Sequence, residues 1–380
     1  MTRVVVLGCG RIGSAIARDL CADSSMRVTV VDAAAASFAG LRGVANLETR
    51  VADLGSGDAI RTLVEGADIV IGALPSALGW TALKAVIEAG RPYVDISFLP
   101  EDPLQFDGLA RQRGVTAVVD CGVAPGLANL LVGHGDAQLD YTERVEYYVG
   151  GLPFARRWPY QYKAPFAPLD VLEEYTRPVR LRENGRLVTR PALSEPHLVD
   201  FPRVGTLEAF NTDGLRTLLT TIAAPNMREM TLRYPGHAEL MRVLRETGLF
   251  GKDPIEVAGV TVRPIDVTAR LLFPHWELEA GEAEFTVLRV VVSGLRGGRP
   301  ATVRFDLLDK YDPATGLTSM ARTTAFPCAI VARMIAEGTF RRPGVTPPEV
   351  LGREDALVQR MLEELARRGV NVRRVDAPGP

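Results

Sequence analysis

The chain opens with an apolar run that ends in a glycine-rich turn, Val4-Val5-Val6-Leu7-Gly8-Cys9-Gly10-Arg11-Ile12-Gly13. A second apolar run, Val28-Thr29-Val30-Val31, ends at the acid Asp32, about twenty residues after the last of these glycines. Strand, Gly-x-Gly-x-x-Gly turn, helix, strand and acid follow in the order of a dinucleotide-binding unit. This stretch predicts a Rossmann-type α/β domain.

Each glycine of the turn has its own predicted role. Gly8 permits the tight turn, Gly10 lets the backbone approach a pyrophosphate, and Gly13 allows the helix to pack closely on the strand. Arg11 and Ile12 open the predicted helix, whose N-terminus is expected to face the phosphates.

Asp32 bears on the choice of cofactor. A carboxylate at this position accepts hydrogen bonds from a ribose 2′-hydroxyl and repels a 2′-phosphate. Residues Ala33 to Ala36 offer no cation, while Arg42 lies close enough in the sequence to leave NADP open. We therefore expect NAD, with NADP less favoured.

The composition is that of an ordinary globular protein with more than one domain. The chain has 380 residues, of which 47% are hydrophobic and 24% charged. Its 44 Lys and Arg and 46 Asp and Glu give a net charge of −2, so no overall field favours nucleic acid or an anionic membrane. Because we see no membrane span and no signal peptide, we expect a cytoplasmic protein.

The four cysteines are scattered, and none has the spacing of a metal site. We expect them to be reduced thiols, and we expect no metal. They are Cys9, Cys21, Cys121 and Cys328.

Apolar strand-like runs alternate with helical patterns as far as Asp120, which predicts a doubly wound parallel sheet. Ligands of such sheets lie beyond the carboxyl ends of the strands. Beyond the first turn and Asp32, the residues expected to contact the cofactor at these ends are Asp53, Leu74, Pro75, Gly122 and Val123.

The pattern changes after the first domain. Residues 144–151 alternate with a period of two, and residues 284–293 and 301–309 also have the character of strands, which predicts an α+β substrate domain with an antiparallel sheet. Helical patterns follow at 326–336 and 353–368, separated by a predicted loop at 341–348, and residues 376–380 are expected to be mobile. The predicted domains are residues 1–125, residues 126–321, and a C-terminal segment, 322–380, that returns to the first domain.

Six further motifs follow one another along the chain. They are Ile71-Gly72-Ala73-Leu74-Pro75, Val94-Asp95-Ile96-Ser97-Phe98, Gly122-Val123-Ala124-Pro125-Gly126, Tyr148-Val149-Gly150-Gly151-Leu152-Pro153, Thr231-Leu232-Arg233-Tyr234-Pro235-Gly236-His237 and Ala321-Arg322-Thr323-Thr324-Ala325-Phe326-Pro327. Together they resemble the saccharopine dehydrogenase superfamily and, within it, the lysine 6-dehydrogenase branch. The resemblance implies a Rossmann domain, an α+β domain that also mediates dimerisation, and hydride transfer between nicotinamide and a carbon that bears an amine.

Two positions separate the branches of this family. The saccharopine-forming members have an acid in the loop of Ala124 and an arginine near the position of Thr212, and the lysine dehydrogenases resemble this chain at both places. The resemblance therefore implies NAD-dependent oxidation of the ε-amine of L-lysine to allysine, which cyclises. Arg216 could supply a displaced guanidinium, so a saccharopine- or carboxynorspermidine-type dehydrogenase acting on a secondary amine stays open. A non-catalytic dinucleotide-sensing protein is a less favoured alternative.

Catalysis needs a neutral amine, because hydride leaves only when the nitrogen lone pair is available. His237 follows a sharp turn and is expected to titrate near neutral pH and relay protons, with a structural role almost equally favoured. Lys163 matches a Tyr-Lys pair of the family and would orient the substrate or act as a base, unless it is an exposed loop residue. Asp95 ends a strand at the ligand edge, where it is expected to serve in acid–base chemistry or to cap a helix.

Arg233 lies in a stretch that the resemblance implies for binding the substrate carboxylate, and a guanidinium can bind a carboxylate bidentately. We look to Glu208 or Asp213 for the α-ammonium group. The other expected substrate-binding residues are Ser97, Gly150, Thr212 and Thr231. We expect a homodimer formed through the second domain, with the apolar run 288–292 suited to a shared sheet.

Overall fold

The computed structural model describes residues 1–279 and 281–378 and divides into two compact units. Unit 1 comprises Met1–Gln138, Arg216–Ile222 and Ala321–Val372. Unit 2 comprises Leu139–Leu215, Ala223–Met320 and the residues from Arg373 onward. The expected boundaries differ from this division in two ways: residues 126–138 and 216–222 belong to unit 1, and the C-terminal segment returns to unit 1 only as far as Val372.

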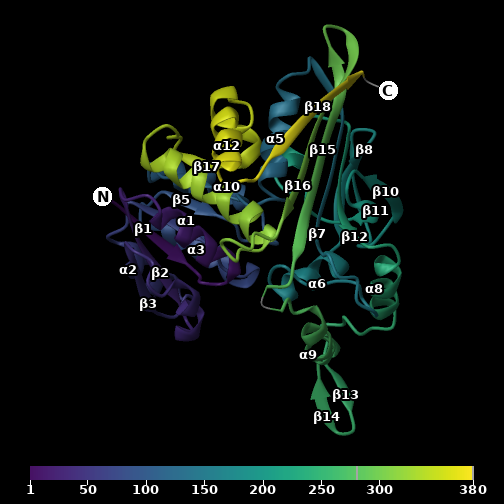
Figure 1. Cartoon of the computed structure of the whole chain (residues 1–380), viewed down its shortest axis with the longest axis horizontal. Helices are drawn as coiled ribbons and strands as arrows, with labels where there is room; N and C mark the ends of the chain where they lie inside the picture. The colour runs from purple at the N-terminus through teal and green to yellow at the C-terminus, as the bar shows by residue number, and fades with distance from the viewer. Residues whose placement is uncertain (280, 379–380) are drawn as a thin grey trace. The chain divides into compact units, whose positions relative to one another are not determined.

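Unit 1 is built on a seven-stranded sheet in the order β17-β6-β5-β4-β1-β2-β3, and every paired neighbour is parallel (Figure 1). The strands are β1 (Thr2–Leu7), β2 (Met26–Asp32), β3 (Leu47–Val51), β4 (Ile69–Gly72), β5 (Tyr93–Asp95), β6 (Thr116–Val118) and β17 (Gly344–Thr346). The helices are α1 (Arg11–Cys21), α2 (Gly57–Val64), α3 (Ser76–Glu88), α4 (Asp107–Gln112), α5 (Leu127–Asp136), α7 (Leu218–Thr221), α10 (Ser319–Ala336), α11 (Pro348–Leu351) and α12 (Asp355–Arg367), with two short 3₁₀ turns, η1 (Ala35–Leu41) and η2 (Pro103–Phe106). The predicted Rossmann fold is confirmed.

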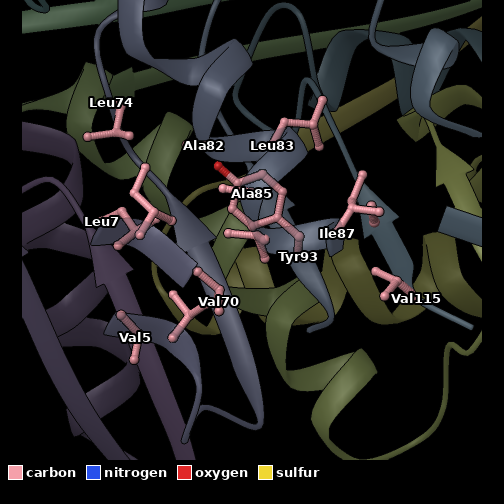
Figure 2. Packing of buried hydrophobic residues seen from close by; sticks show 14 of the residues in the cluster. Val5, Leu7, Val70, Leu74, Ala82, Leu83, Ala85, Ile87, Tyr93 and Val115 are labelled. Atoms are coloured by element: carbon pink, nitrogen blue, oxygen red, sulfur yellow. The ribbon is translucent and has the colours of Figure 1, made fainter. Parts of the chain in front are cut away.

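The core of unit 1 forms where the sheet is covered by α3. Val5 and Leu7 of β1 and Val70 of β4 lie in one buried cluster with Ala82 and Ala85 of α3 (Figure 2). Small residues on the helix allow it to lie close to the β-branched side chains of the sheet. This packing fixes the carboxyl ends of β1 and β4, where the glycine turn lies.

The C-terminal segment contributes a strand that the sequence did not predict. Residues 344–346 form β17, which extends the sheet beyond β6, so the prediction of a loop over 341–348 is wrong there. The N–H of Gly344 bonds the Val115 carbonyl at 2.8 Å, and that of Val345 bonds Asp107 at 2.9 Å. A three-residue strand is too short to produce a periodic signal.

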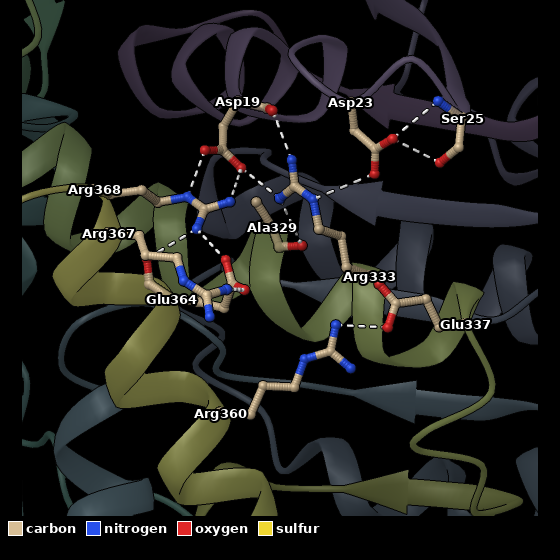
Figure 3. Close-up of polar contacts among 10 residues, drawn as sticks. All are labelled: Asp19, Asp23, Ser25, Ala329, Arg333, Glu337, Arg360, Glu364, Arg367 and Arg368. Carbon is tan, nitrogen blue, oxygen red and sulfur yellow. Dashed lines mark hydrogen bonds and ion pairs between the residues drawn. The ribbon is translucent and has the colours of Figure 1, made fainter.

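Ion pairs hold the C-terminal helices against α1 (Figure 3). The Nε atom of Arg368 donates to Asp19 at 2.6 Å, and an Nη atom of Arg333 donates to the same carboxylate at 2.5 Å. Arg368 also binds Glu364 of α12 at 2.6 Å. Because these side chains are mostly buried, the network ties residues far apart in the chain into one unit.

Unit 2 is built on a mixed sheet in the order β10-β11-β12-β7-β15-β16-β18, with β8 and β9 attached to β12 (Figure 1). The pairs β10–β11, β11–β12, β7–β15, β15–β16, β8–β9 and β8–β12 are antiparallel, and β7 pairs with β12 in parallel. The strands are β7 (Tyr141–Pro153), β8 (Val179–Glu183), β9 (Arg186–Arg190), β10 (His197–Phe201), β11 (Gly205–Asn211), β12 (Asn226–Arg233), β15 (Glu284–Arg296), β16 (Arg299–Lys310) and β18 (Val372–Pro378). The helices are α6 (Pro168–Thr176), α8 (His237–Glu246) and α9 (Pro264–Trp276), and β13 (Ile255–Val257) and β14 (Val260–Val262) form a separate hairpin.

Two predictions about unit 2 need correction. Residues 376–378 lie in β18 rather than in a mobile end, while 379–380 are outside the described residues. The run 288–292 lies in β15, whose two edges are already paired with β7 and β16, so it has no free edge for a shared sheet. The homodimer itself stays a prediction.

The described residues contain no helix long and apolar enough to cross a membrane. All four cysteines are buried free thiols.

Candidate functional site

The glycine turn between β1 and α1 has the geometry expected of a dinucleotide loop. Gly8 has φ of +101°, and a Cβ there would lie 2.2 Å from the Ala73 carbonyl oxygen. A Cβ on Gly13 would lie 2.1 Å from the Gly8 carbonyl oxygen, whereas one on Gly10 would meet nothing within 4 Å. Gly8 and Gly13 are therefore required by packing, and Gly10 leaves open space at the N-terminus of α1 that suits a phosphate. Arg11 is exposed at this end and Ile12 is half-buried.

Asp32 ends β2 beside the turn. Its carboxylate accepts hydrogen bonds from the N–H groups of Cys9 at 2.7 Å and Ala34 at 2.9 Å, and from the Ser37 hydroxyl at 3.2 Å. These bonds hold the side chain where a ribose hydroxyl would approach in this fold. Asp53, two residues after the end of β3, is exposed and accepts the Gly55 N–H within its own turn at 2.8 Å.

The end of β4 lies against the glycine turn. The N–H of Ala73 bonds the Leu7 carbonyl at 2.8 Å, and Leu74 is buried while Pro75 is exposed just before α3. Gly122 and Val123, which follow β6, are both buried in a turn closed by Gly126, whose φ is +140°. The cofactor-binding role of these residues stays a prediction.

Asp95 and Ser97 form a buried pair at the end of β5. One carboxylate oxygen of Asp95 accepts the Ser97 hydroxyl at 2.8 Å and its N–H at 3.1 Å. The other oxygen, Oδ2, is buried and has no hydrogen-bond partner within the described residues, although the Tyr93 side chain also interacts with this carboxyl group and partly lowers its pKa. Burial, with a smaller contribution from the nearby charge of Asp120, raises the pKa of Asp95 to about 7. A carboxyl group with this pKa can accept or release a proton near neutral pH.

Arg216 pairs with Asp120 inside unit 1. Its Nε and one Nη atom bind the carboxylate at 3.3 and 3.2 Å, and both side chains are buried. A further Nη atom donates to the Leu99 carbonyl, and the guanidinium lies over the Phe98 ring. The guanidinium that we left open as a substitute carboxylate-binding group is therefore occupied by protein partners.

Arg233 of β12 is likewise buried and paired. Its guanidinium binds Glu174 of α6 at 2.5 Å, donates to the Tyr175 hydroxyl at 3.2 Å, and lies over the Tyr162 ring at 4.4 Å. A substrate carboxylate would have to share this cation with Glu174, so the geometry also fits a structural role. Its predicted substrate role stays untested.

His237 does not titrate near neutral pH as predicted. The ring is buried at the start of α8, with Nε2 lying 3.0 Å from the Tyr175 hydroxyl and Nδ1 lying 3.0 Å from the Tyr160 carbonyl oxygen. Burial and the charge of Arg233 lower its pKa to about 3. The imidazole is therefore neutral at physiological pH, and its predicted role in relaying protons stays untested.

Lys163 is held within unit 2. Its Nζ donates to the Glu277 carbonyl at 2.7 Å and lies 3.8 Å from Glu282, and its side chain is only 11% exposed. It is therefore not an exposed loop lysine. Its catalytic role stays a prediction.

Thr212 and Thr231 bind each other and a buried glutamate. Their hydroxyl oxygens lie 2.8 Å apart, and the Thr212 hydroxyl donates to Glu229 at 2.5 Å. Burial is the main cause that raises the pKa of Glu229 to about 8. Sequence reasoning missed Glu229, although it shares the alternating polar positions 229, 231 and 233 of β12.

The remaining candidates have local partners. Asp213 is buried and binds Arg180 through both oxygens, and Glu208 accepts the Ala238 N–H at 2.9 Å near the start of α8. Gly150 is a packing glycine, because a Cβ there would lie 2.7 Å from Leu232. Among residues 1–279 and 281–378, no group of His, Cys, Asp or Glu is arranged to hold a metal ion.

Comparison with known proteins assigns the family. Residues 4–118 match the saccharopine dehydrogenase NADP binding domain, and residues 122–370 match the saccharopine dehydrogenase C-terminal domain. The chain belongs to the saccharopine dehydrogenase family. This confirms the superfamily predicted from the motifs, and the first match supports a nicotinamide dinucleotide as the cofactor of this family member.

The relatives differ in length. Alpha-aminoadipic semialdehyde synthase of Mus musculus is 25% identical over 277 residues, which are 69% of this chain and 30% of the relative. The chain thus spans less than half the length of the synthases that it matches. Saccharopine dehydrogenase [NADP(+), L-glutamate-forming] of Saccharomyces cerevisiae is 20% identical over 419 residues, which are 91% of this chain and 93% of the relative.

A solved structure shares the whole fold. Apo saccharopine dehydrogenase (L-Glu forming) from Saccharomyces cerevisiae superposes with a TM-score of 0.81 at 18% identity and covers 99% of this chain and 100% of its own. At this identity the likeness establishes the fold of the family and no more.

Proposed function

We propose that this member of the saccharopine dehydrogenase family oxidises the ε-amine of L-lysine. The observation behind the proposal concerns Thr212 and Arg216, the two residues placed to bind the extra carboxylate of saccharopine. Neither side chain offers an available positive charge. The side chain of Thr212 carries no positive charge, and its hydroxyl donates a hydrogen bond to Glu229. Arg216, the nearby substitute, is buried against Asp120. A substrate with one carboxylate matches this arrangement better than one with an additional glutamate arm.

The proposed reaction is an oxidation followed by a hydrolysis. The ε-ammonium loses a proton, the ε-carbon gives a hydride to the nicotinamide ring, and the C–N bond becomes an imine. Water then adds, and the C–N bond breaks to leave allysine and ammonia. Bound nicotinamide dinucleotide supplies the hydride acceptor.

Asp95 is the proposed acid–base residue. Its Oδ2 atom has no hydrogen-bond partner among the described residues, and its pKa of about 7 leaves a substantial ionised fraction at neutral pH. The amine has an ordinary pKa of about 10.4 and must be deprotonated before oxidation, so a nearby carboxylate of this kind assists the reaction. The Ser97 hydroxyl positions the carboxylate.

For the cofactor we propose NAD. The carboxylate of Asp32 is held at the end of β2 by two backbone N–H groups, and a 2′-phosphate there would be repelled. NADP is the second candidate, because the matched domain and the yeast relative carry NADP in their names.

A substrate panel tests the proposed reaction. The protein is mixed with NAD or NADP and with L-lysine, L-ornithine or saccharopine, and reduction of the cofactor is followed by absorbance. We expect reduction with L-lysine, and loss of about a hundredfold in kcat for Asp95→Asn. The exposed acid Glu101, replaced by Gln, is the control. Reduction with saccharopine alone would contradict the proposal.

The second candidate function is a saccharopine-type dehydrogenase that acts on a secondary amine. It is favoured by the names of the relatives in this family. Release of glutamate from saccharopine, without ammonia from lysine, identifies it.

We also propose a homodimer. The resemblance, rather than a described contact, supports it. Sedimentation at micromolar concentration should give twice the chain mass of 41.2 kDa, and a single-chain mass would overturn the proposal.

A further inference from the structure

One cluster in unit 2 contains three acids, Glu174, Asp213 and Glu229, but only two of them are paired with an arginine. Glu174 binds Arg233, and Asp213 binds Arg180. Glu229 forms no ion pair with any residue in the described ranges. The two groups that donate hydrogen bonds to its carboxyl, the Thr212 hydroxyl and the Gly214 N–H, are neutral. With all three acids ionised, this cluster has a net charge of −1. Burial of an uncompensated carboxylate is costly, so the cluster favours either a bound proton or a bound monocation.

The carboxyl group of Glu229 is held in one orientation. Its Oε2 atom accepts the Thr212 hydroxyl at 2.5 Å and the Gly214 N–H at 3.1 Å. Its Oε1 atom accepts no hydrogen bond from the described part of the chain. A Cβ on Gly214 would lie 2.7 Å from the carboxyl carbon, so glycine is what allows this N–H to approach. One oxygen is fixed by the protein, and the other is left for a further donor.

The charges around Glu229 favour a cation. Glu174 faces it from α6, and Asp213 faces it from the turn after β11, and both help to raise its pKa. Arg233 and Arg180 are the cations of this cluster, and each is bound to its own acid. Thr231, on the same face of β12, is a neutral hydroxyl. An ammonium group that approached Oε1 would restore neutrality.

We propose that Glu229 binds the α-ammonium group of the amino-acid substrate. This inference rests on the proposed function, which supplies the substrate class. The reacting ε-amine must be neutral when the hydride leaves, whereas the α-ammonium stays charged throughout the reaction. A fixed carboxylate without its own cation suits the group that stays charged. Thr212 and Gly214 are then positioning residues, because they act through Glu229.

Substrate binding should therefore be linked to proton release. Burial raises the pKa of Glu229 to about 8 in the free protein, so the carboxyl is largely protonated at pH 7. A bound ammonium favours the ionised form and displaces this proton. Affinity for L-lysine should fall by up to about tenfold for each pH unit below about 8.

Calorimetric titration of the intact protein, without cofactor turnover, tests the assignment. The probes are L-lysine, L-norleucine, which lacks the ε-amine, and 6-aminohexanoate, which lacks the α-amine. The variants are Glu229→Gln and the control Glu146→Gln, whose acid pairs with Arg144 and Arg228 on the sheet. Gly214→Ala is a second variant, because the added Cβ moves the carboxyl without removing it.

We expect Glu229→Gln and Gly214→Ala to weaken the binding of L-lysine and L-norleucine by at least about tenfold and to leave the binding of 6-aminohexanoate unchanged. Glu229→Gln should also abolish the proton release, because it removes the titrating carboxyl. Equal effects of Glu229→Gln and Glu146→Gln on binding would overturn the proposal. So would weaker binding of 6-aminohexanoate alone, or failure of the wild-type protein to bind L-lysine and L-norleucine. If L-lysine binds as expected but is not oxidised, the proposed function fails while the role of Glu229 stands.

Discussion

The Nδ1 atom of His237 lies 3.0 Å from the carbonyl oxygen of Tyr160, and this contact fixes the tautomer of the ring. A carbonyl can only accept, so Nδ1 carries the proton and Nε2 accepts from the Tyr175 hydroxyl. Tyr175 in turn accepts from Arg233. The arginine, the tyrosine and the histidine therefore form one oriented chain of hydrogen bonds.

The first prediction is that His237 stays neutral with its proton on Nδ1 from about pH 5 to about pH 8, because burial and Arg233 lower its pKa to about 3. Nitrogen NMR of the histidine rings, assigned by comparison with His237→Gln, measures this directly. The exposed His197 is an internal comparison. A His237 titration midpoint near pH 6.5 would show that the ring is not held as described.

The second prediction concerns Asp95 and stability. The pKa of the carboxyl is about 7 in the folded protein against 3.8 as the ordinary value. Because the folded protein holds this proton more tightly than the unfolded chain does, protonation of Asp95 stabilises the fold. This stabilisation is complete below the pKa of the unfolded state and is lost as the pH rises from about 4 to about 7. The amide of Asp95→Asn does not titrate, so this variant does not lose stability in this way. Its unfolding free energy relative to the wild type should therefore rise on the order of 3 kcal/mol between about pH 4.5 and about pH 7.5.

Urea unfolding at the two pH values measures this change, with Glu101→Gln as the exposed control. If the difference between Asp95→Asn and the wild type is the same at both values, Asp95 has an ordinary pKa.

The third prediction is that Asp32→Asn narrows the preference for NAD over NADP by at least about tenfold, because it removes the charge and keeps the shape. Asp32→Ala should narrow it too, but should also loosen the turn by removing the bonds to Cys9 and Ala34. Dissociation constants of both cofactors provide the measurement. An unchanged ratio in both variants would mean that the carboxylate does not select the cofactor.

The fourth prediction concerns the pair of Arg233 and Glu174. Removing one member of a buried pair leaves the other charge uncompensated, at a cost of about 3–5 kcal/mol. Arg233→Met should therefore destabilise the protein more than the double variant Arg233→Met with Glu174→Gln. Denaturant unfolding of the four proteins of this cycle measures the coupling. Additive effects would mean that the two side chains do not interact.

The dinucleotide domain could be predicted from the sequence because its signals are local. Gly8 and Gly13 are required by contacts with neighbouring backbone, and Asp32 ends a strand whose Val28, Val30 and Val31 are buried. Each requirement is visible within a few residues. The short strand β17 could not be predicted, because its partner β6 lies more than two hundred residues earlier in the chain.

The candidate site of unit 2 was harder to predict, because burial there comes from distant segments. Polar side chains occupy every second position of β12 at residues 229, 231 and 233. A strand face with this pattern is usually exposed, but here it is buried. His237 follows a Pro-Gly turn, which is typical of the surface, yet Tyr162 and Tyr175 pack against its ring. The tertiary contacts, rather than the local pattern, set the pKa values of Glu229 and His237.

Oxidation of the ε-amine is tested most directly by following the ε-nitrogen itself. L-lysine that carries heavy nitrogen only at the ε position is incubated with the protein and NAD, and the ammonia released is analysed by mass spectrometry together with the NADH formed. Oxidation of the ε-amine predicts labelled ammonia in amounts equal to NADH. Unlabelled ammonia, or no ammonia while saccharopine reduces the cofactor and releases glutamate, would contradict it.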